Sequence, residues 1–106
     1  MFENSSEETA YHKLLILYIL YKIKMDLTNS QITQVVLETE MMNYFSLQQL
    51  LSQLMESKFL KIYKDSDKEY YCLTQKGLET LESLMLKIPI DSANTVDHYI
   101  KLNKES

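Results

Sequence analysis

The sequence has 106 residues, of which 45% are hydrophobic and 25% charged, and its formal net charge at pH 7 is −4. The length fits one small domain with one core. The single Gly excludes a Gly-rich phosphate-binding loop, the single Cys excludes an intrachain disulfide, and two His with one Cys cannot supply the usual four ligands of zinc. The negative charge and the complete absence of Arg argue against non-specific binding to nucleic acid.

The N-terminal segment is polar and acidic, unlike a signal peptide, and we expect residues 1–7 to be flexible. The capping-box pattern Ser5-Ser6-Glu7-Glu8 predicts the start of a helix, and Tyr11–Lys24 contains no helix breaker. The longest apolar run, Leu14–Tyr21, is far shorter than the roughly 20 residues that a membrane span needs. These features predict a cytoplasmic protein without a membrane segment.

The first helix has apolar residues on two opposite sides. A helix on the surface of a domain shows one apolar stripe, so this helix is predicted to be sandwiched. One stripe consists of Ile16, Ile19, Leu20 and Ile23. The other consists of Leu14, Leu17, Tyr18 and Tyr21. This second stripe is either ordinary core, covered by later helices, or the interface of a homodimer.

Two further capping-box patterns follow. Thr28-Asn29-Ser30-Gln31 predicts a second helix that ends near Glu40, and Ser46-Leu47-Gln48-Gln49 predicts a third helix over about 46–57. The third helix has an apolar face of leucines and a polar outward face. Tyr44 and Phe45, which precede it, are predicted to pack into the core as a hydrophobic staple. The outward face is predicted to hold Gln48, Gln49, Ser52, Gln53 and Glu56.

The hydrophobic period then changes from 3.6 to 2. Leu60–Lys64 and Glu69–Leu73 alternate between polar and apolar residues around a polar turn, which predicts a β-hairpin over 59–73. Thr74 is predicted to cap a fourth helix that Pro89 ends, and Asp91 or Ser92 is predicted to cap a short last helix.

The order of helix, helix, helix, hairpin and helix resembles a winged helix-turn-helix. Residues 46–60 are similar to the recognition helix of PadR-like and MarR-like transcriptional regulators, and residues 73–78 (LTQKGL) to their L-T-x-x-G step out of the wing. The chain is most similar to an uncharacterised bacterial domain-of-unknown-function family of winged-helix proteins. The resemblance implies a mainly α fold with a two-stranded wing (α+β), a winged-helix domain at 8–88 and a C-terminal helix or tail at 89–106.

The resemblance also implies sequence-specific binding to double-stranded DNA by a homodimer. Glutamine can bind adenine through two hydrogen bonds, so the third helix is predicted to read bases, and the lysines of the wing and its base to contact phosphates. The predicted DNA-binding residues of the third helix are Ser46, Gln48, Gln49, Ser52 and Gln53, of which the three glutamines and Ser52 are predicted to read bases. The predicted phosphate contacts are Lys58, Lys64, Lys68 and Lys76.

The charge distribution leaves an alternative open. Thr28–Ser57 contains no basic residue, whereas Lys58–Lys76 has five lysines against three acids. The outward glutamines can equally form a solvated face, and the lysines can equally protect an edge strand. The alternative function is therefore a winged-helix protein-interaction or dimerisation module without DNA binding. No catalytic, metal-binding or cofactor-binding set of residues is apparent, so we do not expect an enzyme.

Overall fold

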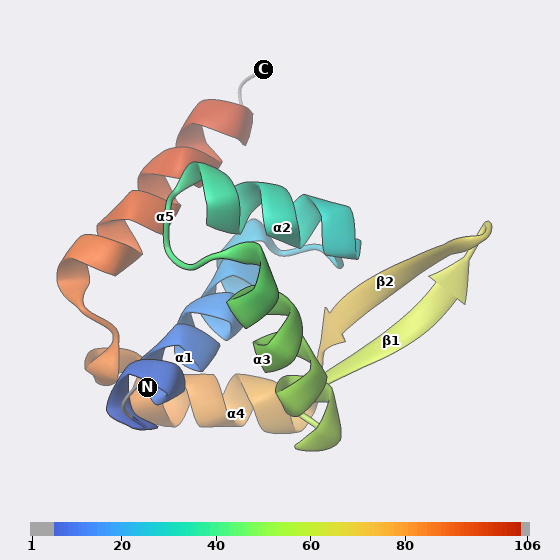
Figure 1. Ribbon diagram of the computed structural model, residues 1–106, viewed down its shortest axis with the longest axis horizontal. Helices are drawn as coiled ribbons and strands as arrows, with labels where there is room; N and C mark the ends of the chain where they lie inside the picture. The colour runs from blue at the N-terminus through green and yellow to red at the C-terminus, as the bar shows by residue number, and fades with distance from the viewer. Residues whose placement is uncertain (1–5, 105–106) are drawn as a thin grey trace.

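Five α-helices, one 3-10 turn and one antiparallel hairpin make up residues 6–104, the part of the chain that the computed structural model describes. This mainly α architecture with a small hairpin confirms the predicted fold class, and the order of elements is a winged-helix layout (Figure 1). The elements are α1 (Ser6–Ile23), α2 (Asn29–Glu38), α3 (Tyr44–Glu56), β1 (Leu60–Asp65), β2 (Lys68–Leu73), α4 (Gln75–Leu84), the 3-10 turn (Met85–Lys87) and α5 (Ile90–Lys104).

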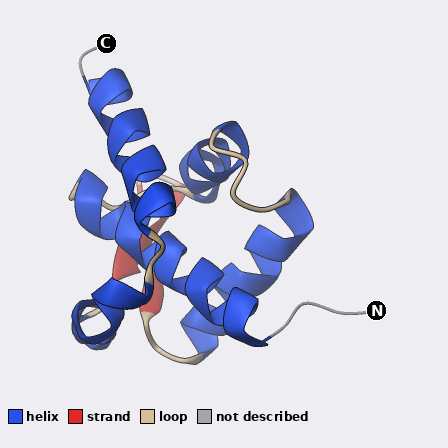
Figure 2. Ribbon diagram, turned by 90° about the vertical axis from the view of Figure 1, so that its left-hand side faces the viewer, coloured by secondary structure: helices blue, strands red, loops and turns tan. Residues whose placement is uncertain are grey.

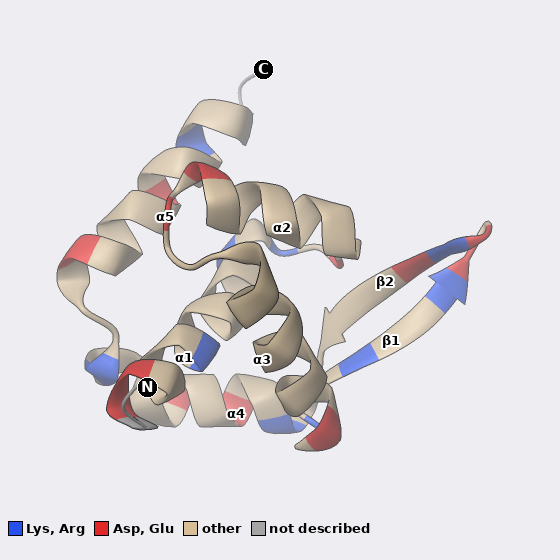
Figure 3. Ribbon diagram, in the orientation of Figure 1, with Lys and Arg blue, Asp and Glu red and all other residues tan. Residues whose placement is uncertain are grey.

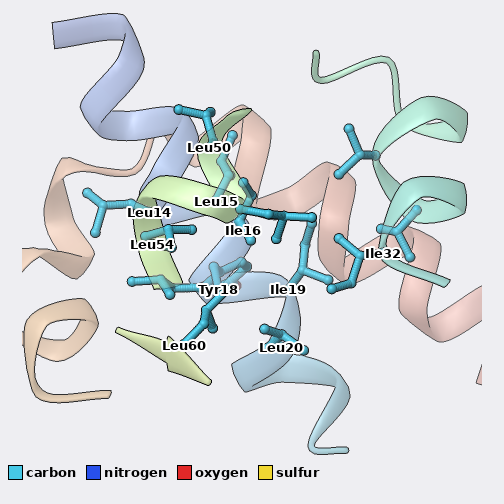
Figure 4. Packing of buried hydrophobic residues seen from close by; sticks show 14 of the residues in the cluster. Leu14, Leu15, Ile16, Tyr18, Ile19, Leu20, Ile32, Leu50, Leu54 and Leu60 are labelled. Carbon is cyan, nitrogen blue, oxygen red and sulfur yellow. The ribbon is translucent and has the colours of Figure 1, made fainter. Parts of the chain in front are cut away.

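The helices form a body from which the hairpin projects. In Figure 1 the hairpin extends away from the helices on the right, and in Figure 2, where the left-hand side of Figure 1 faces the viewer, helices lie in front of the strands. α1 is the central helix of this body, and α3, α4, α5 and β2 all contact it. Every side chain from Leu14 to Leu20 is therefore buried. Figure 4 shows this stretch of α1 clustered with Ile32 of α2, Leu50 and Leu54 of α3 and Leu60 of β1.

The interface that was predicted on α1 is wrong for three of its four residues. Leu14, Leu17 and Tyr18 are buried in the chain's own core, because α4 and α5 cover this side of α1. The Tyr18 hydroxyl donates a hydrogen bond to Asp97 Oδ1 of α5 at 2.8 Å. Tyr21 alone of the predicted set is exposed, at 37%. The second apolar stripe is thus the ordinary core that the alternative interpretation described.

The N-terminal caps of α2 and α3 differ in how well they match the prediction. The Thr28 capping box is confirmed, since the Thr28 hydroxyl accepts from the Gln31 amide and the Gln31 side chain accepts from the Thr28 amide. The predicted cap at Ser46 is wrong. α3 begins at Tyr44, and Asn43 is its cap: Asn43 Oδ1 accepts from the Ser46 amide at 2.8 Å. The capping box predicted from Ser5 begins outside the described residues.

Each of the first three helices is followed within two residues by a residue with positive φ, although none of these residues is glycine. Lys24, Glu40 and Lys58 have φ of 66°, 56° and 69°. At the end of α3 the Phe59 amide donates to the Leu54 carbonyl at 2.9 Å, and the Lys58 amide donates to the Met55 carbonyl at 3.0 Å, which is a Schellman motif. Lys58 therefore adopts the strained backbone in the place where glycine is usual.

The hairpin is one residue longer on each strand than predicted. Asp65 pairs with Lys68 at its end, and the two-residue turn between them, Ser66 and Asp67, has φ of 53° and 68°. Two consecutive positive φ values are typical of a type I′ turn, whose twist matches that of the strands. Tyr63 stacks on the opposite Tyr70, with ring centroids 5.6 Å apart, and this cross-strand pair supports the register that the turn sets.

The C-terminal helices also depart from the predicted bounds. The Thr74 cap is confirmed, since the Thr74 hydroxyl accepts from the Gly77 amide at 2.9 Å. α4 ends earlier than predicted, at Leu84, and a 3-10 turn follows it. Pro89 precedes α5 directly and its carbonyl accepts from the Ala93 amide, so α5 begins ahead of the two predicted caps. α5 is 15 residues long rather than short, and its Val96 is buried in the core.

Candidate nucleic-acid interface

One face of α3 is buried and the opposite face is open. Leu47, Leu50, Leu51 and Leu54 are all buried on the inner face. The outward face has exposed residues at spacings of four and three, which is the repeat of one helix face. These residues are Phe45, Gln49, Ser52 and Glu56. We call this set the outward stripe of α3.

Gln48 does not belong to the outward stripe, contrary to the prediction. Its Oε1 accepts from Asn29 Nδ2 at 2.7 Å, and its Nε2 donates to Asn29 Oδ1 at 3.0 Å. The same Nε2 lies 3.4 Å from Thr33 Oγ1. Both ends of the Gln48 amide therefore connect α3 to α2, and this side chain is not free to read a base. Of the other predicted residues, Gln49 and Ser52 are exposed, whereas Ser46 and Gln53 are half-buried.

Tyr44 and Phe45 are not core residues. Because α3 starts at Tyr44, both side chains project from its first turn, and they are 47% and 82% exposed. Their rings meet edge to face, with centroids 5.8 Å apart. The prediction of a hydrophobic staple failed because it depended on a helix start at Ser46. The Asn43 cap, which is as favourable as Ser, was the signal that could have identified these residues.

The predicted lysines of the hairpin are exposed but lie opposite acids. Lys64 pairs in register with Glu69, and Lys68 pairs with Asp65 (Figure 3). Residues 60–73 contain three lysines and three acids, so the hairpin itself has no net charge. The net positive charge of residues 58–76 therefore comes from Lys58 and Lys76, which lie at the base of the hairpin.

Lys58 and Lys76 both lie where α3 ends. Lys76 Nζ donates to the Ser57 carbonyl at 3.1 Å and lies 5.2 Å from the centroid of the Phe59 ring. A cation at this position interacts favourably with the C-terminal end of the α3 dipole. Lys76 thus has a structural role, and Lys58 is exposed beside it.

The helix-turn-helix has three acids, Glu38, Glu40 and Glu56, and none of them lies on α3 before its last residue, since Glu40 is in the connection between α2 and α3. Glu38 is the last residue of α2, at the end of that helix farthest from the hairpin (Figures 1 and 3). Glu56 is the last residue of α3. The outward stripe from Phe45 to Ser52 is consequently uncharged.

The connection between α1 and α2 holds the hairpin in place. Leu27 exchanges two backbone hydrogen bonds with Tyr71 of β2, at 3.2 and 2.7 Å. The Tyr63 hydroxyl donates to Asp26 Oδ2 at 2.7 Å, and this hydrogen bond raises the pKa of Tyr63 to about 12. Burial raises the pKa of the Cys72 thiol, which is unfavourable for a reactive cysteine.

Residues 6–104 contain no group of three His, Cys, Asp or Glu side chains that could hold a metal ion. Within the same range no helix is long and apolar enough to cross a membrane.

The described elements define an α+β protein with a winged-helix layout, in which α3 lies beside a projecting hairpin. The chain belongs to the family described as a domain of unknown function (DUF4364), whose sequence model matches residues 12–106. The similarity to an uncharacterised family is thereby confirmed. No curated protein and no solved structure matches the chain.

Proposed function

We propose that this chain is a PadR-like transcriptional regulator that binds specific sequences of double-stranded DNA. α3 lies in the major groove, and the hairpin follows the adjacent backbone, as in other winged helices. The protein acts as a homodimer on two half-sites in the cytoplasm. The observation that carries this proposal is the open, uncharged outward stripe of α3, from Phe45 to Ser52, on a helix that an exposed hairpin follows in the chain.

The helical geometry and the side chains of the stripe support base reading. An α-helix fits the major groove, and only one face of it can meet the base edges. α3 has such a face, since its opposite face is buried. Gln49 can bind adenine through two hydrogen bonds, and Ser52 can donate to or accept from a base.

The charges predict weak binding by one subunit. Of the four predicted phosphate contacts, Lys76 donates its ammonium group to the Ser57 carbonyl. The other three are Lys58, Lys64 and Lys68. Three such contacts give a slope of about −2.7 in the logarithm of affinity against the logarithm of salt concentration. Two subunits on two half-sites double the number of contacts, which is why the proposal includes a dimer.

Selection from random duplex DNA at about 50 mM salt tests the proposal. We expect the wild-type chain to enrich a defined sequence. Gln49→Ala is expected to relax the preference at one position, whereas Lys64→Ala weakens binding to all sequences alike.

Gln48→Ala is the matched control for Gln49→Ala. Because the Gln48 amide joins α3 to α2, its loss is expected to lower stability by about 1–2 kcal/mol without a change of base preference at one position. Loss of a single base preference in Gln48→Ala but not in Gln49→Ala contradicts the proposed orientation of α3.

A second candidate function is a protein-interaction module without DNA binding. Two observations favour it: the hairpin has no net charge, and Tyr44 and Phe45 form an exposed aromatic pair at the start of α3. Aromatic residues are enriched in protein interfaces. This candidate predicts that no DNA sequence is enriched in the selection, so the same experiment separates the two functions.

A further inference from the structure

Phe45 is the least polar and the largest exposed side chain on the outward stripe of α3. It is 82% exposed, and its ring meets the Tyr44 ring edge to face. A phenylalanine has no hydrogen-bonding group, so it cannot satisfy the donors and acceptors of base edges or phosphates. An apolar group is therefore a favourable partner for this side chain.

We propose that Phe45 contacts the 5-methyl group of a thymine in the major groove and thereby selects thymine at one position of each half-site. This inference rests on the proposed function, because it requires α3 to lie in the major groove. Among the four bases of DNA, thymine alone presents a methyl group there, and apolar side chains such as Phe recognise it.

The neighbouring residues of the stripe support an A·T-containing site. Gln49 is four residues from Phe45 on the same helix face, so the two side chains start about 6 Å apart. Base pairs are stacked about 3.4 Å apart, and the two residues therefore reach base pairs within about two steps of each other. Residues 45–52 contain no Lys or Arg, which are the usual partners of guanine O6 and N7.

The experiment replaces thymine by deoxyuridine, which lacks only the 5-methyl group. The duplex enriched by the wild-type chain is synthesised with one thymine replaced at a time, and affinity is measured by fluorescence anisotropy at about 50 mM salt. Removal of a contacted methyl group is expected to weaken wild-type binding about fourfold at one position in each half-site. Phe45→Ala is expected to bind more weakly and to show no difference between thymine and deoxyuridine at that position.

Two further variants control for the general effects of the substitution. Leu86→Ala removes a 100% exposed apolar side chain on the 3-10 turn, away from α3, and is expected to keep both the affinity and the thymine preference. Phe45→Leu keeps an apolar group at the same position and is expected to retain part of the preference.

The possible failures of the inference and of the proposed function are distinguishable. If a duplex is enriched and the effect of each deoxyuridine is the same in the wild type and in Phe45→Ala, the thymine contact is wrong and DNA reading stands. An enriched site that contains no thymine likewise shows that the thymine contact is wrong while DNA reading stands. If the wild type enriches no sequence, both are wrong, and the aromatic pair is better explained as a protein-binding surface.

Discussion

The left-handed backbone positions of this protein are occupied by residues other than glycine. Lys24, Glu40 and Lys58 follow the ends of α1, α2 and α3 and have positive φ. The single glycine, Gly77, is used for a close approach instead, because a Cβ at this position would collide with the Phe59 carbonyl oxygen. These two uses of the backbone lead to opposite expectations for glycine substitutions.

Lys58→Gly is expected to stabilise the fold. Glycine adopts φ near 69° without the steric strain of a side chain, which is worth about 1 kcal/mol, or about 5 °C in Tm for a domain of this size. Thermal unfolding followed by circular dichroism measures the shift. Lys101→Gly, at an exposed position within α5, is the control and is expected to lower stability by about 1 kcal/mol. A lower Tm for Lys58→Gly contradicts the account of this helix end.

Gly77→Ala is expected to destabilise the fold by about 1–3 kcal/mol, although alanine is the better helix former. The Phe59 carbonyl accepts from both the amide and the hydroxyl of Thr74, so the clash disturbs the junction between α3, the hairpin and α4. Urea unfolding measures the loss. Ser83→Ala, exposed in the same helix, is expected to be neutral or slightly stabilising. Equal stability of Gly77→Ala and the wild type is the result that excludes a clash.

The hydrogen bond from Tyr18 of α1 to Asp97 of α5 makes the stability of the fold depend on pH. Burial and the hydrogen bond to Asp97 raise the pKa of Tyr18 from 10.0 to about 12. The folded chain therefore holds this proton more tightly than the unfolded chain does. The resulting stabilisation is complete below pH 10 and is lost as the pH rises towards 12.

Tyr18→Phe is expected to remove this pH-dependent contribution and, at neutral pH, to cost about 1.5 kcal/mol of stability. Urea unfolding of both proteins between pH 8 and pH 12 provides the comparison, with the pH range set by the Tyr18 pKa. The stability difference between wild type and variant should shrink above pH 10. A difference that stays constant across this range means that the Tyr18 proton is not coupled to folding.

The sequence predicted those elements whose signals are local. The hairpin of β1 and β2 and the caps at Thr28 and Thr74 depend on neighbouring residues, and the structure confirms them. The start of α3 was misplaced because Asn43 and Ser46 are both good caps, and the choice between them depends on tertiary contacts. The role of Gln48 could not be predicted, since its partner Asn29 lies on another helix.

The candidate site was predicted only in part, because some of its features depend on local sequence and others on tertiary contacts. Gln49 and Ser52 are exposed on α3 as the helical period requires. The cross-strand partners of Lys64 and Lys68 follow from the hairpin register, which the count of charges along the sequence did not resolve. The burial of both sides of α1 depends on α4 and α5, which are far away in the sequence.

The dimensions of the molecule are compatible with a dimer on DNA. The protein measures 40 × 31 × 28 Å along its principal axes. Half-sites of helix-turn-helix dimers are about 34–36 Å apart, so two copies side by side can present two α3 helices one DNA turn apart. Light scattering at two protein concentrations tests the association. We expect the mass of a dimer at the higher concentration, and a monomer there contradicts a preformed homodimer.

Sequence-specific DNA recognition by α3 is the central claim, and selection of the wild-type chain on random duplex DNA at about 50 mM salt tests it most directly. The account predicts enrichment of an A·T-containing half-site that occurs twice, about 10 base pairs apart. A selected pool with the same sequence distribution as the starting pool would contradict it.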